Sequence, residues 1–213
     1  DKEFKKDASA YYYRGLSKVA LKNYENAIED FDKAIHYDSK NLNYRTMRAR
    51  TYEAMGKNGN AASDFKKIVS LKRGGAETKD HLRVAEAAVR NGNYNEALVY
   101  YNIMIKENEW DSDAYLDRAR LHQKMGHNYE AINDYTAALR LDPSKKVVYK
   151  ERGILFVDTK AFRRAILDLN EALTLEPNNG KLYYYRAIAK QYHGDHEEAE
   201  VDFSMAKRYG ENL

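Results

Sequence analysis

One cluster in the sequence has the composition of a metal site. Its members are His193 and His196, three residues apart, with Asp195, Glu197 and Glu198 beside them. Imidazole nitrogens and carboxylate oxygens are ligands that zinc takes in proteins. The cluster falls, however, in a predicted turn between two helices, where exposed polar side chains are typical. We therefore expect no metal ion here.

Closely spaced carboxylates such as Glu29, Asp30 and Asp32 could supply a general acid and a general base. Helix surfaces are rich in carboxylates, so this grouping alone does not indicate an active site. The sequence has no glycine-rich phosphate loop, no serine nucleophile signature and no His-Glu-x-x-His zinc motif. Cysteine is absent, which excludes disulfide bonds, thiolate catalysis and thiolate metal sites. We expect a protein that is not an enzyme and uses no cofactor.

Five arginines recur along the chain, and each is followed by an aspartate sixteen residues later. The pairs are Arg14 with Asp30, Arg48 with Asp64, Arg118 with Asp134, Arg152 with Asp168, and Arg186 with Asp202. Val84 and Tyr100 replace both members in the third copy. A single charged residue left without its partner near a packed surface destabilises a fold more than the loss of both residues. The replacement of both members together therefore predicts that each arginine and aspartate form a structural ion pair. The alternative is a ladder of arginines that binds an acidic ligand.

These spacings belong to a repeat of about 34 residues that runs through the chain. Each copy predicts two amphipathic helices separated by a short turn, which makes them antiparallel neighbours. We expect a column of small residues, with Gly15 and Gly153 facing it, to allow the two helices to approach closely. An aromatic column should fill the gap between consecutive hairpins, because no single repeat buries its own apolar face. The small column is Ala27, Ala61, Ala97, Ala131, Ala165 and Ala199, and the aromatic column is Phe31, Phe65, Tyr101, Tyr135 and Phe203.

Six copies of the repeat follow a polar lead-in at residues 1–7. The predicted copies span about 8–41, 42–77, 78–111, 112–145, 146–179 and 180–213. A two-residue insertion near Gly74 and Gly75 interrupts the period, and it should alter the stacking between the second and third copies. The sequence thus predicts one elongated all-α array rather than two independent domains.

Composition is typical of a soluble folded protein, with 43% hydrophobic and 32% charged residues among 213. The formal charge is +3, with basic and acidic residues interspersed, so we expect no nucleic-acid partner. No run of about eighteen apolar residues occurs, so we expect no membrane insertion in this stretch.

The pattern of aromatic, glycine and alanine residues resembles the tetratricopeptide repeat. The first copy shows it as Tyr11, Gly15, Tyr24, Ala27, Phe31 and Ala34, and the fifth as Tyr149, Gly153, Phe162, Ala165, Leu169, Ala172 and Pro177. Six copies cover essentially the whole chain. The resemblance implies a right-handed superhelical solenoid of six antiparallel hairpins that acts as a protein-interaction scaffold.

The resemblance also implies a concave groove, lined by the first helix of each hairpin, in which a partner peptide or helix lies. The implied groove residues are Tyr12, Leu16, Arg50, Lys79, Leu82, Arg83, Glu86, Arg90, Leu116, Arg120, Lys124, Lys150, Ile154, Tyr184, Ile188 and Tyr192. The set is apolar at both ends and basic in the middle. We therefore expect a partner segment with an acidic centre and apolar flanks.

Some members of this family hold a partner's C-terminal carboxylate with five polar or basic side chains. Lys79 and Arg83 match the pair that the third repeat supplies, but Tyr12, Leu16 and Met47 occupy the other three places. The match is incomplete, which argues against binding of chaperone tails. A looser anionic contact at Lys79 and Arg83 is the alternative.

A different class of function is self-assembly, or docking on another domain, through the last helix. That helix would expose part of Val201, Met205 and Tyr209. The nineteen tyrosines and the YYYRG opening are similar to bacterial versions of the repeat, and the chain starts at Asp1 rather than Met. We expect an exported, periplasmic or envelope-associated bacterial protein, with a cytoplasmic location as the alternative.

Overall fold

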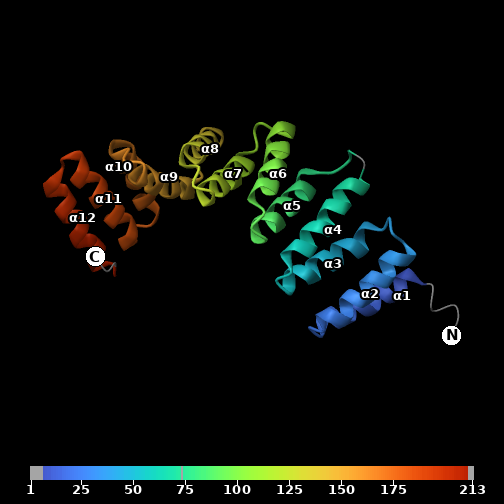
Figure 1. Cartoon of the computed structure of the whole chain (residues 1–213). Helices are drawn as coiled ribbons and strands as arrows, with labels where there is room; N and C mark the ends of the chain where they lie inside the picture. Colours follow the sequence, from blue (N-terminus) through green and yellow to red (C-terminus); the bar gives the residue numbers. More distant parts are fainter. Residues whose placement is uncertain (1–6, 73, 211–213) are drawn as a thin grey trace. The chain divides into compact units, whose positions relative to one another are not determined.

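The computed structural model describes residues 7–72 and 74–210, and its regular structure there is entirely helical (Figure 1). The helices in that part of the chain are α1 (Ala8–Ala20), α2 (Tyr24–Tyr37), α3 (Leu42–Ala54), α4 (Asn58–Leu71), α5 (Thr78–Arg90), α6 (Tyr94–Glu107), α7 (Ser112–Lys124), α8 (Asn128–Leu141), α9 (Lys146–Asp158), α10 (Phe162–Leu175), α11 (Gly180–His193) and α12 (His196–Arg208). They form antiparallel pairs, as the repeat predicts. Each of these helices is too short or too polar to span a lipid bilayer.

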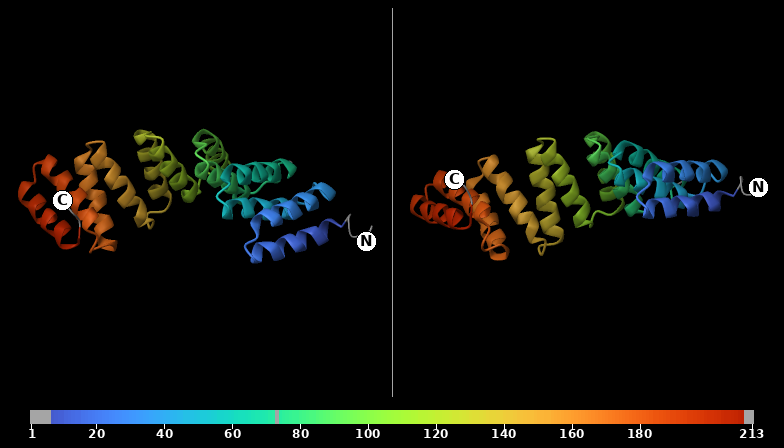
Figure 2. Two further views of the ribbon diagram at one scale, coloured as in Figure 1. Left: turned by 60° about the horizontal axis from the view of Figure 1, so that its bottom comes forward. Right: turned by 90° about the horizontal axis from the view of Figure 1, so that it is seen from below.

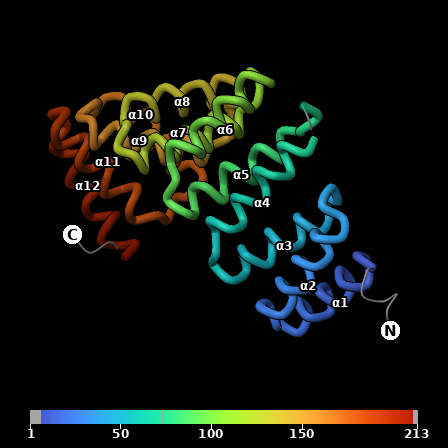
Figure 3. Tube along the Cα trace, turned by 45° about the vertical axis from the view of Figure 1, so that its right-hand side comes forward, coloured from blue at the N-terminus to red at the C-terminus, as the bar shows by residue number. Residues whose placement is uncertain are grey.

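The chain divides into two compact units, Asp1–Asn108 and Glu109–Leu213. The first unit contains the hairpins α1/α2, α3/α4 and α5/α6, and the second contains α7/α8, α9/α10 and α11/α12. Within each unit, successive hairpins stack side by side (Figures 2 and 3). The two-residue insertion at Gly74 and Gly75 lies inside the first unit, between α4 and α5.

Local signals in the sequence explain where the helices begin and end. Asp7 accepts hydrogen bonds from the backbone N–H groups of Ser9 and Ala10 and so caps α1. The turn inside most hairpins needs a residue with positive φ, which glycine adopts without strain. The glycines there are Gly56, Gly92, Gly126 and Gly194, whereas Lys22 and Lys160 adopt φ near +60° in the first and fifth hairpins.

The alanine column is fully buried in all six hairpins, as predicted. The atoms nearest to Gly15 and Gly153 belong to the large side chains one turn beyond it. A Cβ atom added to Gly15 would lie 2.7 Å from Cε1 of Phe31, and one added to Gly153 would lie 3.1 Å from Cγ of Leu169. The glycines therefore make room for the large side chains of the next column, because those side chains reach back between the two helices of their own hairpin.

The predicted arginine–aspartate pairs are confirmed in all five hairpins that carry them. In each pair the guanidinium Nε and Nη2 donate to the two oxygens of one carboxylate at 2.5–2.9 Å. In the third hairpin Val84 is fully buried, and Tyr100 packs against the same core cluster. The pairs are structural, so the arginines do not form a free ladder for an acidic ligand.

Three of these arginines also connect consecutive hairpins. Nη1 of Arg152 donates to the hydroxyl of Thr136 on the preceding hairpin at 2.9 Å. Arg186 donates in the same way to Asn170, and Arg48 to Asp32. One guanidinium thus fixes both the closure of its own hairpin and its stacking on the hairpin before it.

Candidate functional site

The two groups that could have carried chemistry are engaged in structural contacts. Nδ1 of His193 lies 2.9 Å from a carboxylate oxygen of Asp195, and both side chains are exposed. Asp30 is 1% exposed and accepts hydrogen bonds from Arg14, with Lys18 2.7 Å away. In residues 7–72 and 74–210, no three histidine or acidic side chains converge as metal ligands would.

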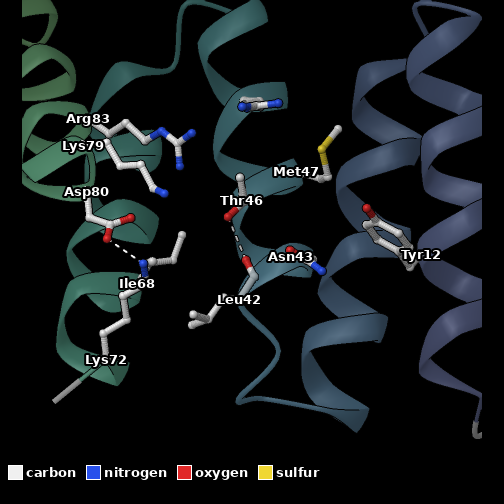
Figure 4. Close-up of a pocket in the computed structure, with 11 residues that line it drawn as sticks. Tyr12, Leu42, Asn43, Thr46, Met47, Ile68, Lys72, Lys79, Asp80 and Arg83 are labelled. Carbon is white, nitrogen blue, oxygen red and sulfur yellow. Dashed lines mark hydrogen bonds and ion pairs between the residues drawn. The ribbon is translucent and has the colours of Figure 1, made fainter. Parts of the chain in front are cut away.

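Four of the predicted groove residues line one pocket in the first unit. Tyr12 comes from α1, Arg50 from α3, and Lys79 and Arg83 from α5; the cavity has a volume of about 360 Å³. We call this site the basic pocket. Its other lining residues are Leu42, Asn43, Thr46, Met47, Ile68, Lys72 and Asp80. The pocket is open to solvent, and Figure 4 shows its residues facing one another across the first helices of three consecutive hairpins.

The basic side of the pocket is built on α5. Lys79 and Arg83 are one helical turn apart, so their side chains lie on the same face of the helix. Figure 4 shows both extending from α5 toward α3, where Thr46 and Asn43 lie. The hydroxyl of Thr46 donates to the carbonyl of Leu42 at 2.8 Å, which leaves its oxygen lone pairs directed outward as acceptors.

Ion pairs neutralise only part of the positive charge in the basic pocket. Lys72 lies 2.6 Å from Asp80, and exposed Lys79 lies 2.5 Å from exposed Glu77. Burial raises the pKa of Asp80, but hydrogen bonds from Lys72 and the Glu77 backbone bring that pKa below its ordinary value. Asp80 is therefore a charged partner of Lys72, and its negative charge is balanced by that lysine.

Arg50 and Arg83 make no ion pair within the described residues, although both line the pocket. Arg50 is exposed and Arg83 is half-buried. Two guanidinium groups therefore share one cavity whose lining carboxylate, that of Asp80, is paired with Lys72. Such an arrangement attracts a negatively charged group from outside the chain.

The opposite side of the pocket is apolar. The ring of Tyr12 packs against Tyr44, with centroids 4.9 Å apart, and against Phe31 at 6.0 Å. Met47 and Leu42 continue this surface. A bound segment would thus meet guanidinium and ammonium groups on one side and an aromatic and thioether surface on the other.

Three of the other four cations of the predicted basic centre have partners inside the chain. Arg120 donates through Nε and Nη2 to Glu151 at 2.7–3.2 Å, and this contact raises the pKa of Arg120. Nζ of Lys150 lies 2.9 Å from Glu176, and Arg90 pairs with Glu53. Lys124 is exposed without an ion pair in the described structure.

The sequence analysis did not anticipate the partners Glu151 and Glu176, since both lie outside the columns it assigned to the groove. One signal was available for Glu151. Glu151 stands 31 residues after Arg120, in α9, the first helix of the following hairpin. There it lies about one turn from the predicted groove residue Ile154. Glu176 lies directly before Pro177 at the end of α10, and its position gives no comparable signal.

Three of the apolar residues predicted for the groove, Leu116, Ile154 and Ile188, lie in the protein core or pack against it. Leu116 is 6% exposed and belongs to the cluster around Tyr135, so it is not available to a partner. Among the predicted groove residues of the first unit, Leu16 and Leu82 are half-buried and Glu86 is exposed. Ile154 and Ile188 are half-buried and pack against the core of the second unit.

Two tyrosines of the predicted groove belong to the second unit and are not among the residues that line the basic pocket. Tyr184 packs edge-on against Phe203, with centroids 6.2 Å apart. Tyr192 stacks on Phe162 at the turn end of the hairpins and remains 72% exposed. Leu42 and Asn43 of the basic pocket were not predicted, because they lie about one turn away from the columns that the resemblance supplied.

Comparison with known proteins places this fold in a family. The model of the tetratricopeptide repeat matches residues 8–41, 42–74 and 112–145. An Hsp70-Hsp90 organizing protein 1 from Arabidopsis thaliana is 28% identical over 82% of this chain and 31% of its own length. The Hsp70-Hsp90 organizing protein of Triticum aestivum is 23% identical over 79% of this chain and 41% of its own length. The chain thus spans less than half the length of these relatives.

Solved structures show the same architecture. The C-terminal part of a repeat-containing protein from Cytophaga hutchinsonii has a TM-score of 0.76 at 19% identity, over 93% of this chain and 78% of that one. YrrB, described as a TPR protein with an unusual peptide-binding site, has a TM-score of 0.64 at 20% identity, over 83% of this chain and 90% of that one. The family match, the relatives and the paired helices agree with one another, and the chain is therefore a tetratricopeptide-repeat protein.

Proposed function

We propose that this chain is a non-catalytic adaptor that binds a segment of a partner protein in the basic pocket. Repeat arrays of this kind offer extended surfaces for protein partners. The relatives from Arabidopsis thaliana and Triticum aestivum are named as organizing proteins for Hsp70 and Hsp90. The proposal takes from them only the general role of an adaptor, because the chain spans less than half of their length.

One observation carries the proposal: Arg50 and Arg83 occupy a position where the second unit has an ion pair. Two repeats further on, the corresponding residues are Arg120 and Glu151, whose side chains lie 2.7 Å apart. In the first unit the acidic member is replaced by Arg83, so Arg50 faces a second guanidinium here instead of a carboxylate partner. The fold tolerates an acid at the position of Arg83, because Glu151 occupies the corresponding position in the second unit. A ligand would supply the negative charge that this position lacks in the first unit.

The two sides of the pocket define the chemistry of the ligand. A carboxylate would sit between Arg50, Lys79 and Arg83, where charge-assisted hydrogen bonds are strong and Arg can bind in a bidentate manner. A neighbouring apolar side chain of the ligand would cover Tyr12 and Met47. We therefore propose a partner segment in which an acidic residue lies next to an aliphatic or aromatic one.

Chaperone tails are a second candidate, supported by Lys79 and Arg83. These residues supply two of the five side chains that clamp a C-terminal carboxylate in the resembling family members. Tyr12 and Met47 now form an apolar surface where the clamp has polar groups. We propose that a chaperone tail binds much more weakly than a segment that pairs an acidic residue with an apolar one.

Affinity capture with charge-reversed variants tests the proposal. The Arg50→Glu, Arg83→Glu variant should lose the partner that the wild-type chain captures, because both side chains reach the cavity and neither holds the fold together. An Arg120→Gln variant is unsuitable for this purpose, since it would leave Glu151 without its partner. Lys146→Glu with Lys181→Glu provides a control with the same change of charge at exposed positions of the second unit.

Capture is read by mass spectrometry, and circular dichroism confirms that each variant is folded. A partner retained by the control but lost by the Arg50→Glu, Arg83→Glu variant would support binding in the basic pocket. Equal capture by all three chains would exclude the pocket as the binding site. A peptide array of the captured partner would then show whether the bound segment pairs an acidic with an apolar residue.

A further inference from the structure

The second unit has an open hollow at the turn end of its last two hairpins. It has a volume of about 470 Å³ and lies where the turn from α9 to α10 meets the end of α11. We call it the arginine hollow. Its lining residues are Lys160, Ala161, Phe162, Arg163, Arg164, Tyr192 and His193. None of them belongs to the basic pocket, which lies entirely in the first unit.

The hollow concentrates three basic side chains. Lys160, Arg163 and Arg164 are all exposed, and none of them forms an ion pair among the described residues. Arg164 lies over the ring of Phe156 at 4.7 Å, an interaction that leaves its N–H groups available at the edge of the guanidinium. Three cations within five residues therefore face solvent at one place.

An exposed aromatic stack lies next to these cations. The rings of Phe162 and Tyr192 are nearly parallel, at 14°, with centroids 5.1 Å apart. Tyr192 is 72% exposed, so one face of the stack is open to solvent. Exposed tyrosine and arginine side chains are the residue types that are enriched where proteins bind one another.

The fold does not require this charge. The first unit has another hollow, between its first two hairpins, which is lined by Glu25, Ile28, Tyr52, Met55, Lys57 and Asn60. Glu25 occupies the place that Arg163 has in the fifth hairpin. The start of the second helix thus forms with an acid at this position as well.

The first turn of a helix in fact favours acidic residues, because the helix dipole is positive there. Glu96 and Glu130 occupy this turn in α6 and α8, whereas the first turn of α10 contains two arginines and no acid. Arg163 and Arg164 therefore oppose the stability of their own helix. The stability of α10 does not explain these two arginines, whereas a contact with a partner molecule would.

We infer that the arginine hollow is a second docking site, which binds an acidic segment of a partner protein. Carboxylates of that segment would pair with Lys160, Arg163 and Arg164. An aromatic or aliphatic side chain of the segment would lie on the open face of Tyr192. Because the two sites lie in different units, this site stands whether or not the basic pocket binds a partner.

Calorimetric titration with a short acidic peptide tests the inference. The probe is an acetylated and amidated peptide of sequence Glu-Glu-Trp-Glu-Glu, and its counterpart has glutamine in place of each glutamate. All chains carry Arg50→Glu and Arg83→Glu, which removes the basic pocket as a competing site. In this background, Arg163→Glu with Arg164→Glu should weaken binding of the acidic peptide at least tenfold.

Lys146→Glu with Lys181→Glu is the matched control, because both lysines are exposed in the first turns of α9 and α11. It changes the net charge by the same amount and should leave the affinity unchanged. The Arg163→Glu, Arg164→Glu variant should unfold at a similar Tm, since acids suit the start of α10 and offset the loss of the contact between Arg164 and Phe156. Loss of binding together with a retained Tm would thus exclude misfolding as the cause.

Three results would overturn the inference. The first is equal affinity of the acidic peptide for the variant and the control. The second is equal binding of the glutamine peptide, which would mean that stacking alone drives the contact. The third is a short oligouridylate that binds more tightly than the peptide and is lost in the same variant, which would assign the hollow to phosphate groups of nucleic acid.

Discussion

Arg152 binds Asp168 through two of its nitrogens, with Nε 2.7 Å from Oδ2 and Nη2 2.9 Å from Oδ1. Asp168 is 5% exposed. Burial raises the pKa of this carboxyl above its ordinary value, and the hydrogen bonds from Arg152 offset only part of that rise. The arginine is therefore the group that makes a buried carboxylate tolerable at this place.

Replacing Arg152 alone should destabilise the protein strongly. Arg152→Val leaves Asp168 buried without its partner, and we expect a loss of about 3 kcal/mol in the free energy of unfolding. Adding Asp168→Tyr reproduces the Val84 and Tyr100 combination of the third hairpin, and should restore much of the loss. Urea unfolding followed by circular dichroism measures both variants. A double variant no more stable than Arg152→Val would show that the two positions are not coupled.

Gly15 and Gly59 should respond to alanine in opposite ways. A Cβ at Gly15 would lie 2.7 Å from the fully buried ring of Phe31, so Gly15→Ala should cost about 1–3 kcal/mol through overpacking. A Cβ at Gly59 would meet only the side chain of Asn91, at 3.1 Å, and that exposed amide can move away. Gly59→Ala should stabilise α4 by up to about 1 kcal/mol, because alanine favours the helix. Thermal unfolding of the two variants measures the difference, and shifts of the same sign would contradict it.

Acid should destabilise the protein through Asp30 and Asp80. Burial raises the pKa of both carboxyls, but hydrogen bonds from Arg14 and Lys18, and from Lys72 and a backbone N–H, bring them below the ordinary value of 3.8. A group whose pKa is lower in the folded state stabilises the fold above its unfolded pKa, and this contribution is lost as the pH falls through the folded value. Stability should thus decline below about pH 4.

Asp80→Asn isolates one of these contributions. The free energy of urea unfolding of this variant should fall less between pH 7 and pH 3 than that of the wild-type chain. Glu29→Gln is the control, because Glu29 is exposed and forms no ion pair in the described structure. A variant that loses as much stability as the wild type would show that Asp80 does not carry the acid sensitivity.

Arg120 and Arg50 occupy corresponding places but should behave differently when shortened to alanine. Arg120→Ala removes a bidentate contact with half-buried Glu151 and should lower the free energy of unfolding by up to about 1 kcal/mol. Arg50→Ala removes no ion pair and should leave the Tm unchanged. Thermal unfolding distinguishes them. An Arg50→Ala variant with a markedly lower Tm would mean that Arg50 supports the fold, which would weaken its assignment to ligand binding.

The sequence was sufficient to predict contacts inside one hairpin. Arg152 and Asp168 are sixteen residues apart in a unit that recurs, so their pairing shows as two columns that vary together. Contacts between hairpins, such as Arg120 with Glu151, depend on the angle at which one repeat stacks on the next. Periodicity does not encode that angle, so the sequence analysis counted Arg120 as an available cation when it is already paired.

The outer face of α12 carries charges where earlier second helices carry aliphatic side chains. Two aliphatic positions recur in the second helices of the second unit. They are Ile132 and Leu139 in α8, and Ile166 and Leu173 in α10. Glu200 and Lys207 take the corresponding places in α12, and both are exposed. Docking of another copy on this face would bury two charges that have no partner there, which is costly.

This face bears on self-assembly through the last helix, which the sequence analysis offered as an alternative function. We expect light scattering to report a monomer over a wide range of concentration. Glu200→Ile with Lys207→Leu should restore the aliphatic columns and produce assemblies that grow with concentration. Ser63→Ile with Lys67→Leu, at exposed positions of α4, serves as a control for added apolar surface. A wild-type dimer that Val201→Asp dissociates would instead establish α12 as an assembly surface, since Val201 is 63% exposed on that helix.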